Sequence, residues 1–298
     1  MNTGHSLSIA GAATFWNVAA SSDRRKIEEG LVELGHADLC PGERTPFAAA
    51  KRAASLLYSG AKYHIGNLKD RAGVSIERVV HKDDTENEYP QVGYITVNED
   101  SRTCSVTIND PSLSWQSKIS AETCLQHEYE RQLTQCAATS IGIALTKACE
   151  KFAGTRLRKN GGVYFIPSFT ADEFAAVAKV FEGAATEGST YVEQLTVAKS
   201  DETLRGVTNS LRANIADRVK EIKQELVDGL GKRGVQNREK ELKQLVDQAA
   251  SYETLLGESL SDIQDELKTA RRELRRNQFA VSAEREREAN AVLTEQSA

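Results

Sequence analysis

A run of apolar residues with helical spacing, from Ser200 to Asn277, constrains the fold of this chain more than any other feature. Successive apolar residues are three or four positions apart, which places a narrow apolar stripe on each of two helices and leaves the other faces polar. Gly229, Gly231 and Gly234 separate the two halves and permit a chain reversal. We therefore predict an antiparallel, coiled-coil-like helical hairpin with arms about 40 Å long.

The second arm of this hairpin carries more apolar surface than a two-helix seam needs. Tyr252, Leu255 and Leu256 widen its stripe. Burying each such side chain is worth roughly 1.5 to 3 kcal/mol, so leaving several in water is costly. We predict that these residues bind a second copy of the chain or a helical protein partner in a four-helix arrangement. The alternative is that they pack on this chain's own helix predicted at 120–152.

The N-terminal part combines strands with a short helix pair. A mixed apolar run predicts a strand at 7–19, and capping residues and glycines delimit helices at about 23–35 and 45–60. From Gly73 to Ile108 the apolar period changes to two, which predicts an antiparallel meander with one solvent-facing side.

The central part contains the most distinctive local motif in the chain. A long helix is predicted at 120–152, bridging the strand-rich and helical halves. The Gly161–Pro167 segment follows, with sequence Gly-Gly-Val-Tyr-Phe-Ile-Pro, and predicts a strand that Pro167 ends. A helix at 170–183 and a strand at 191–197 complete a predicted strand–helix–strand unit.

These elements predict an α+β fold: an antiparallel strand meander with helices, a strand–helix–strand unit and a C-terminal helical hairpin. The predicted domains are 1–115, an N-terminal α+β domain; 116–199, the long helix with the strand–helix–strand unit; and 200–277, the hairpin. Residues 278–298 have a poor apolar stripe and predict a frayed helix or disordered tail.

The net charge of the chain limits which classes of partner it can bind. The net charge of −5 and the pI of about 5.7 argue against a general polyanion-binding protein, because such binding depends on Lys and Arg. Two local basic clusters still leave nucleic acid open as a partner. The alternative is an ion-paired, solvated helix face. The clusters are Arg156, Arg158 and Lys159, and Arg271, Arg272, Arg275 and Arg276.

No sequence pattern predicts a catalytic residue, a metal or a cofactor. Cys124 and His127 are three apart, but no second ligand pair accompanies them, and the acidic run at 83–88 lacks the calcium-loop order. Nucleophile-elbow and phosphate-loop motifs are absent. An enzyme remains open only as a site assembled from scattered residues such as His64, His81, His127 and Glu128.

Cysteine usage and hydropathy suggest a location. Five cysteines without a C-x-x-C pair predict reduced thiols in the cytoplasm. No segment reaches the roughly 18 apolar residues that span a bilayer. The N-terminus lacks the basic region of a signal peptide. We therefore predict a cytoplasmic protein without membrane association.

At Trp16, at Pro41 through the Thr45-Pro46 helix, and above all at Gly161–Pro167, the chain resembles a family of uncharacterised bacterial and phage proteins. The resemblance covers about residues 14 to 230 and implies no activity. It implies a bacterial or phage origin and an intracellular place. With the hairpin, it leads us to predict a non-enzymatic scaffold or adaptor that assembles with itself or a partner. The alternative is a nucleic-acid-associated accessory protein that uses the basic clusters.

Overall fold

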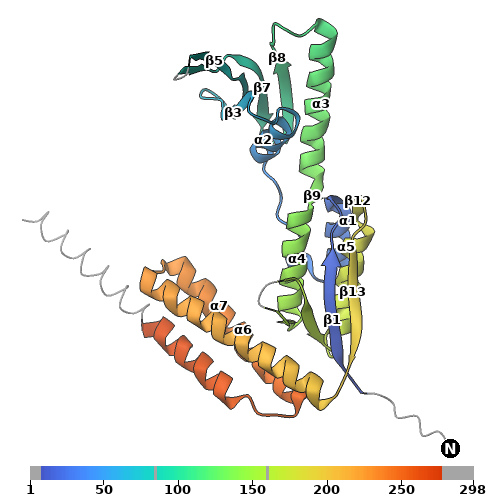
Figure 1. Ribbon diagram of the computed structural model, residues 1–298, viewed down its shortest axis with the longest axis vertical. Helices are drawn as coiled ribbons and strands as arrows, with labels where there is room; N and C mark the ends of the chain where they lie inside the picture. The colour runs from blue at the N-terminus through green and yellow to red at the C-terminus, as the bar shows by residue number, and fades with distance from the viewer. Residues whose placement is uncertain (1–7, 84–85, 159–160, 277–298) are drawn as a thin grey trace, which may run out of the picture. The chain divides into compact units, whose positions relative to one another are not determined.

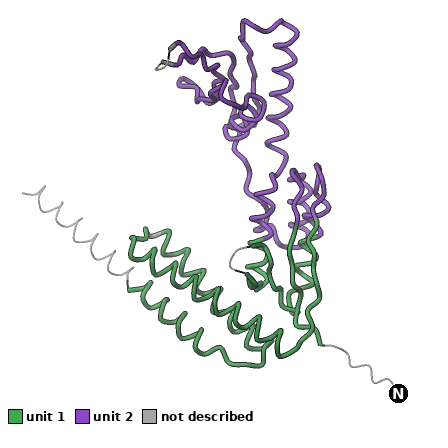
Figure 2. The backbone as a smooth tube through the Cα atoms, viewed as in Figure 1, with its two compact units in different colours: residues 1–16, 146–178, 191–298 green, residues 17–145, 179–190 purple. Residues whose placement is uncertain are grey.

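The computed structural model describes residues 8–83, 86–158 and 161–276, and the chain forms two compact units (Figure 1). Figure 2 shows that each unit is built from separate stretches of chain. Unit 1 comprises residues 1–16, 146–178 and 191–298, and unit 2 comprises 17–145 and 179–190. The fold class is confirmed as mixed α and β with antiparallel sheets and C-terminal helices. The predicted division into consecutive domains stays a prediction, and the predicted tail at 278–298 lies outside the described residues.

A four-stranded sheet forms one part of unit 1. Its order is β10-β11-β1-β13. The strands are β1 (Ile9–Asn17), β10 (Thr155–Arg156), β11 (Tyr164–Pro167) and β13 (Tyr191–Ala198). The Gly161–Pro167 segment thus supplies the predicted strand, which pairs with β1 and β10. All four β11 residues are buried, and Phe165 packs against the helix residues of unit 1.

Helix α5 (Ala171–Gly183) lies between β11 and β13 in sequence, as the predicted strand–helix–strand unit requires. In the sheet, however, β1 is inserted between β11 and β13. Gly11 permits the close approach of β1 to β11, because a Cβ at this position would collide with the backbone oxygen of Ile166.

Three helices form the C-terminal part of unit 1 as far as residue 276, where the described residues end (Figure 1). They are α6 (Asp201–Asp228), α7 (Lys232–Leu256) and a helix at 261–276. The predicted reversal lies where expected: Gly229, with φ of 92°, caps α6, and Gly231 precedes α7. The predicted apolar stripes meet in one buried cluster, which includes Leu211, Ile215, Ile222, Leu242 and Leu267.

Ion pairs show how these helices run. Arg238 of α7 binds Glu225 of α6 with both nitrogens of its fork, at 2.6 and 2.8 Å, and Arg218 of α6 binds Glu241 of α7. The numbers rise on one helix as they fall on the other, so α6 and α7 are antiparallel.

The third helix runs parallel to α6. Arg212 and Lys223 of α6 pair with Asp262 and Glu273, at 2.8 and 3.4 Å. The up-down-up arrangement covers the apolar stripe of each helix with two neighbours.

The predicted hairpin therefore needs a correction, because its second arm consists of two helices. Helix α7 ends at Leu256, and Gly257 follows with φ of 67°, a left-handed conformation that glycine adopts without steric cost. The third helix begins at residue 261, and Glu253 stabilises its start by accepting a hydrogen bond of 2.7 Å from the backbone N–H of Leu260. The sequence does not reveal this break, because Leu256 and Leu260 are four residues apart and so keep the apolar spacing of one continuous helix.

The predicted helix pair lies near the N-terminal end of unit 2. Asp23 caps α1 (Arg24–Glu33), and Thr45 caps α2 (Pro46–Leu57), with the 3₁₀ turn η1 (Ala37–Leu39) between them. Both helices begin where the sequence predicts, because N-capping depends on local residues alone.

The continuous helix predicted at 120–152 is wrong in its middle. Helices α3 (Trp115–Thr134) and α4 (Ala138–Lys151) are separated by β9 (Gln135–Ala137). Strand β9 pairs with β2 (Ser21–Asp23), which also pairs with β12 (Ala185–Glu187). Long-range strand pairing thus overrides a locally helical pattern.

The predicted meander is present as a sheet of order β3-β4-β7-β8, extended by one strand that the pattern did not reveal, β3 (Tyr63–Asn67). The other strands are β4 (Gly73–Arg78), β7 (Gln91–Asn98) and β8 (Thr103–Ile108). A hairpin of β5 (Val80–Asp83) and β6 (Glu86–Glu88) follows β4.

Helices α2 and α3 cover one side of this sheet. Ala50 and Ala53 of α2, and Leu125 and Tyr129 of α3, share a buried cluster with alternate residues of the strands, such as Ile76. The remaining residues of each strand therefore point to the opposite side, which we call the open face.

Candidate nucleic-acid interface

The open face of the β3-β4-β7-β8 sheet is polar and aromatic. Strand register places Ser75 beside both Gly66 and Tyr94, and Tyr94 beside Thr107. His64 and Ser105 are exposed, and Tyr94 and Thr96 are half-buried. The side of this sheet that the helices cover is apolar, whereas the open face is polar. This difference is typical of a sheet whose second side contacts water or a polar partner.

Arg71 and Tyr94 form the central feature of the open face. The guanidinium carbon of Arg71 lies 4.9 Å from the centroid of the Tyr94 ring, a cation–π contact. Arg71 belongs to the loop between β3 and β4, which also carries the exposed Lys69 and Asp70. The contact thus brings a cation over an aromatic ring that has polar neighbours on its strand.

A second aromatic position lies across the face. The rings of His64 and Tyr89 meet edge to face, with centroids 5.6 Å apart. His64 is on β3 and Tyr94 is on β7, so one strand separates them, a distance on the order of 10 Å.

Two small residues, Gly66 and Ser75, pair with each other between the two aromatic positions. Gly66 matters here because a Cβ would lie 2.7 Å from Ser75 Oγ. Ser75 Oγ donates a hydrogen bond of 2.7 Å to Glu77 Oε1, so the floor also offers a carboxylate acceptor.

The sequence predicted strands here but not the site. Tyr94 falls within a predicted strand, but the strand prediction does not reveal that Arg71 packs on it. The available signal was an aromatic residue on the polar side of a strand, close to a basic loop.

The residues predicted to bind a helical partner lie elsewhere in the molecule and are covered by their own chain. Tyr252 is fully buried, its hydroxyl donates a 2.9 Å hydrogen bond to the backbone oxygen of Ala153, and its ring lies 6.4 Å from that of Phe165. Leu256 is buried, and Leu255 packs against the same cluster. The third helix and the sheet of unit 1 supply the contacts that the sequence assigned to a partner.

The predicted basic clusters are partly engaged. Arg271 and Arg275 both face Glu239 of α7, at 3.8 and 3.3 Å, whereas Arg272 and Arg276 are exposed. A single carboxylate on α7, Glu239, thus pairs with two of the four arginines of this cluster.

In the other basic cluster, Arg156 Nε donates to the hydroxyl of Tyr164 at 3.0 Å, and its guanidinium lies over the same ring. Arg158 is exposed, and Lys159 lies outside the described residues.

The scattered residues considered for an enzyme have separate partners. His81 contacts Asn87, His64 contacts Tyr89, and Glu128 binds Arg131. Among the described residues, no group of three or more His, Cys, Asp or Glu side chains is placed to hold a metal ion. All five cysteines are free. Burial raises the pKa of Cys104 to about 11, which disfavours its thiolate.

These features define a mixed α and β protein with an open polar sheet face and a three-helix bundle. The chain belongs to the family of unknown function DUF6744, whose model matches residues 24–287. This membership confirms the resemblance to an uncharacterised family. No curated protein and no solved structure matches the chain. Within the described residues, no helix is both long and apolar enough to cross a membrane.

Proposed function

We propose that this protein is a nucleic-acid-associated accessory protein that contacts single-stranded nucleic acid through the open face. The contact of Arg71 with Tyr94 is the observation that carries the proposal. Proteins that bind single strands combine cations, which follow the backbone, with aromatic rings on which unpaired bases stack. The open face offers both, together with the half-buried Glu77 carboxylate as an acceptor for base amino groups.

The charge of the chain shapes this proposal. A net charge of −5 gives no general attraction for phosphates, so affinity has to come from the local cations Lys69 and Arg71 and from stacking. We infer a cytoplasmic setting in a bacterium or a phage-infected cell. The likeness at Gly161–Pro167 and the free thiols support this inference.

Titration with a fluorescent single-stranded oligonucleotide at low salt tests the proposal. Tyr94→Leu keeps an apolar side chain of similar length but removes the ring, and stacking contributes about 1 to 3 kcal/mol per base. We expect Tyr94→Leu to weaken binding about 5- to 150-fold. Arg71→Glu is expected to weaken it further and to reduce the salt dependence.

Arg205→Glu provides the matched control, because Arg205 is an exposed arginine on α6 and its replacement changes the net charge equally. We expect it to bind like the unmodified protein. Equal losses for Arg205→Glu and Arg71→Glu, or no binding by the unmodified protein at low salt, would contradict the proposal.

Assembly is a second candidate function, favoured by an edge strand. Strand β13 ends the sheet of unit 1, contains no Lys, Arg or Pro, and exposes Tyr191 and Leu195. Long edges without such residues invite pairing with another strand. We infer that β13 pairs with β13 of a second copy, which gives a two-fold symmetric scaffold.

Light scattering after size exclusion measures this association. We expect a dimer that Leu195→Lys converts to a monomer, because a lysine on an edge strand opposes pairing. Val227→Lys is the control, since Val227 is exposed on α6. A monomeric unmodified protein would exclude the assembly.

A further inference from the structure

Unit 2 contains a cavity of about 340 Å³ that none of the functions above uses. The N-terminal end of α2, strand β9 and the first turn of α4 line it. Its volume lies within the range of small-molecule sites, which is about 300 to 1,000 Å³. The polar and charged side chains on its wall are Arg24, Glu43, Arg44, Thr45, Gln135 and Ser140.

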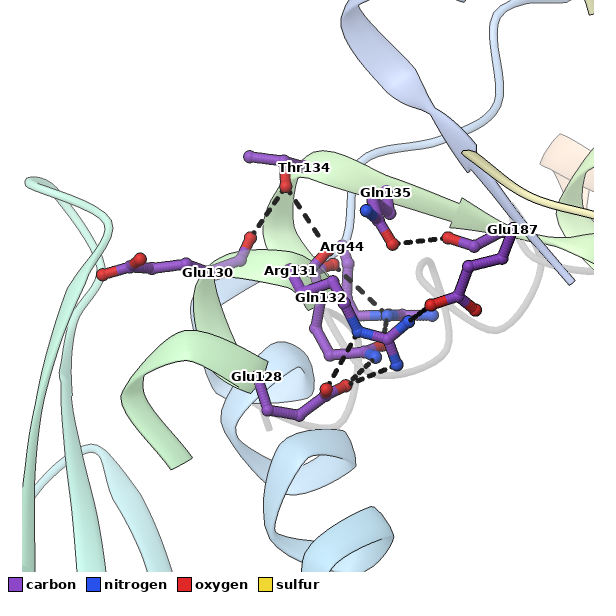
Figure 3. Close-up of polar contacts among 9 residues, drawn as sticks. Arg44, Glu128, Glu130, Arg131, Gln132, Thr134, Gln135 and Glu187 are labelled. Carbon is purple, nitrogen blue, oxygen red and sulfur yellow. Dashed lines mark hydrogen bonds and ion pairs between the residues drawn. The ribbon is translucent and has the colours of Figure 1, made fainter. Parts of the chain in front are cut away.

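Arg44 is the distinctive residue of this cavity, because its charge has no ion-pair partner among the described residues. Arg44 Nη1 donates to the backbone oxygen of Gln132, at 3.3 Å, and to Gln132 Oε1, and both acceptors are neutral (Figure 3). Burial and the nearby Arg52 lower the pKa of Arg44 from its usual value, so an anion bound beside it would relieve both effects.

A chain of hydrogen bonds holds Arg44 in this arrangement. The side-chain N–H of Gln132 donates to Glu128, which turns the amide oxygen of Gln132 toward Arg44. Arg131 binds Glu128 through two hydrogen bonds of 2.9 and 3.0 Å and also reaches Glu187, at 3.1 Å. Glu128 is therefore ion-paired with Arg131 and positions Arg44 through Gln132, and its own effect on the pKa of Arg44 is smaller than those of burial and Arg52.

Arg24 brings a second guanidinium to the cavity wall. Its side chain is only 14% exposed, and Nη1 donates to the backbone oxygen of Pro41. Its carboxylate neighbours, Glu28 and Glu43, lie at 3.8 and 3.5 Å, beyond hydrogen-bonding distance. Glu43 is the one acidic residue of the wall, and it binds Arg102 at 2.9 Å.

Arg24, Arg44 and the buried Cys136 all line this cavity. Burial raises the pKa of Cys136, and Arg24 and, more weakly, Arg44 oppose that rise. Two guanidinium groups thus act on one part of the cavity, where the wall offers one carboxylate that is already paired.

We propose that this cavity binds the phosphate group of a small phosphorylated molecule, with Arg44 and Arg24 as its cationic contacts. Arginine suits this role because its planar fork donates two parallel hydrogen bonds to a phosphate. The volume accommodates more than the phosphate group alone, so the rest of the ligand lies against Ala48, Leu133 and Ala137.

Isothermal titration of the full chain with adenosine monophosphate, inorganic phosphate and adenosine tests this assignment. We expect binding of the monophosphate and weaker binding of inorganic phosphate, with adenosine weakest. Arg44→Gln is expected to weaken binding of the monophosphate about 10- to 100-fold, because one charge-assisted contact is lost. Arg44→Lys is expected to retain part of the affinity, since the charge remains without the fork.

Two further variants keep the test decisive. Arg25→Gln is the matched control, because Arg25 is 86% exposed on α1 and pairs with Glu29. It is expected to bind normally. Ala48→Leu fills part of the cavity from an exposed helical position and should block binding even if Arg44→Gln fails to fold. Equal binding by unmodified protein and Ala48→Leu, or no phosphate-dependent binding at millimolar ligand, would overturn the proposal.

Discussion

Phe165→Ala is expected to lower the free energy of unfolding by about 3 to 5 kcal/mol. Phe165 lies on β11, is buried, and packs against Tyr252 and the helix residues of unit 1. The substitution removes a large apolar group and leaves a cavity, because strand β11 is paired on both sides and cannot collapse. Chemical denaturation followed by circular dichroism measures the change.

Phe169→Ala is the matched control for this experiment. Phe169 lies four residues further along the chain and is 51% exposed, so its replacement creates no cavity. We expect a change within about 0.5 kcal/mol. Similar losses for the two variants would show that Phe165 has no special place in the core.

Asp110→Ala is expected to lower the free energy of unfolding by about 3 kcal/mol. The buried carboxylate of Asp110 accepts hydrogen bonds from the backbone N–H and hydroxyl of Ser112, at 2.9 and 2.6 Å, and from Arg78. Alanine leaves the donors of Ser112 and Arg78 without this acceptor. The exposed Asp100 provides the control, since Asp100→Ala removes an equal charge from the surface.

The contribution of Asp110 to the free energy of unfolding should also depend on pH. Burial raises the pKa of Asp110, but its hydrogen bonds with Ser112 and Arg78 outweigh burial and leave the pKa below its usual value of 3.8. A carboxylate with a lowered folded-state pKa stabilises the protein above the unfolded-state pKa, and this stability is lost as pH falls through the folded-state pKa. Unmodified protein and Asp110→Ala should therefore converge in stability only under strongly acidic conditions. A constant difference between them down to pH 2 would contradict this assignment.

Local signals in the sequence were sufficient for several helix starts and for three strands of the meander. Asp23, Thr45 with Pro46, and Ser200 cap helices where predicted, because a cap depends on residues within one turn. The period-two pattern likewise predicted the meander, because a strand with one buried side repeats every two residues.

The failures share a different cause, which is contact between distant parts of the chain. β9 interrupts a helical pattern because it pairs with β2, and Tyr252 is buried because residues about 100 positions earlier cover it. The Arg44 cavity was not predicted for the same reason: Gln132 and Arg44 are far apart in sequence, and neither belongs to a recognisable motif.

The small sheet of β2, β9 and β12 has a consequence for protein synthesis. Its strands, Ser21–Asp23, Gln135–Ala137 and Ala185–Glu187, leave the ribosome at widely separated times. At roughly 5 to 20 residues per second, β2 waits on the order of ten seconds for its last partner. Until its first partner, β9, has been made, the nascent chain carries β2 as an unpaired strand, which is a feature that chaperones bind. This sheet is therefore complete only after residues 185–187 have been made, although its first strand lies near the start of the chain.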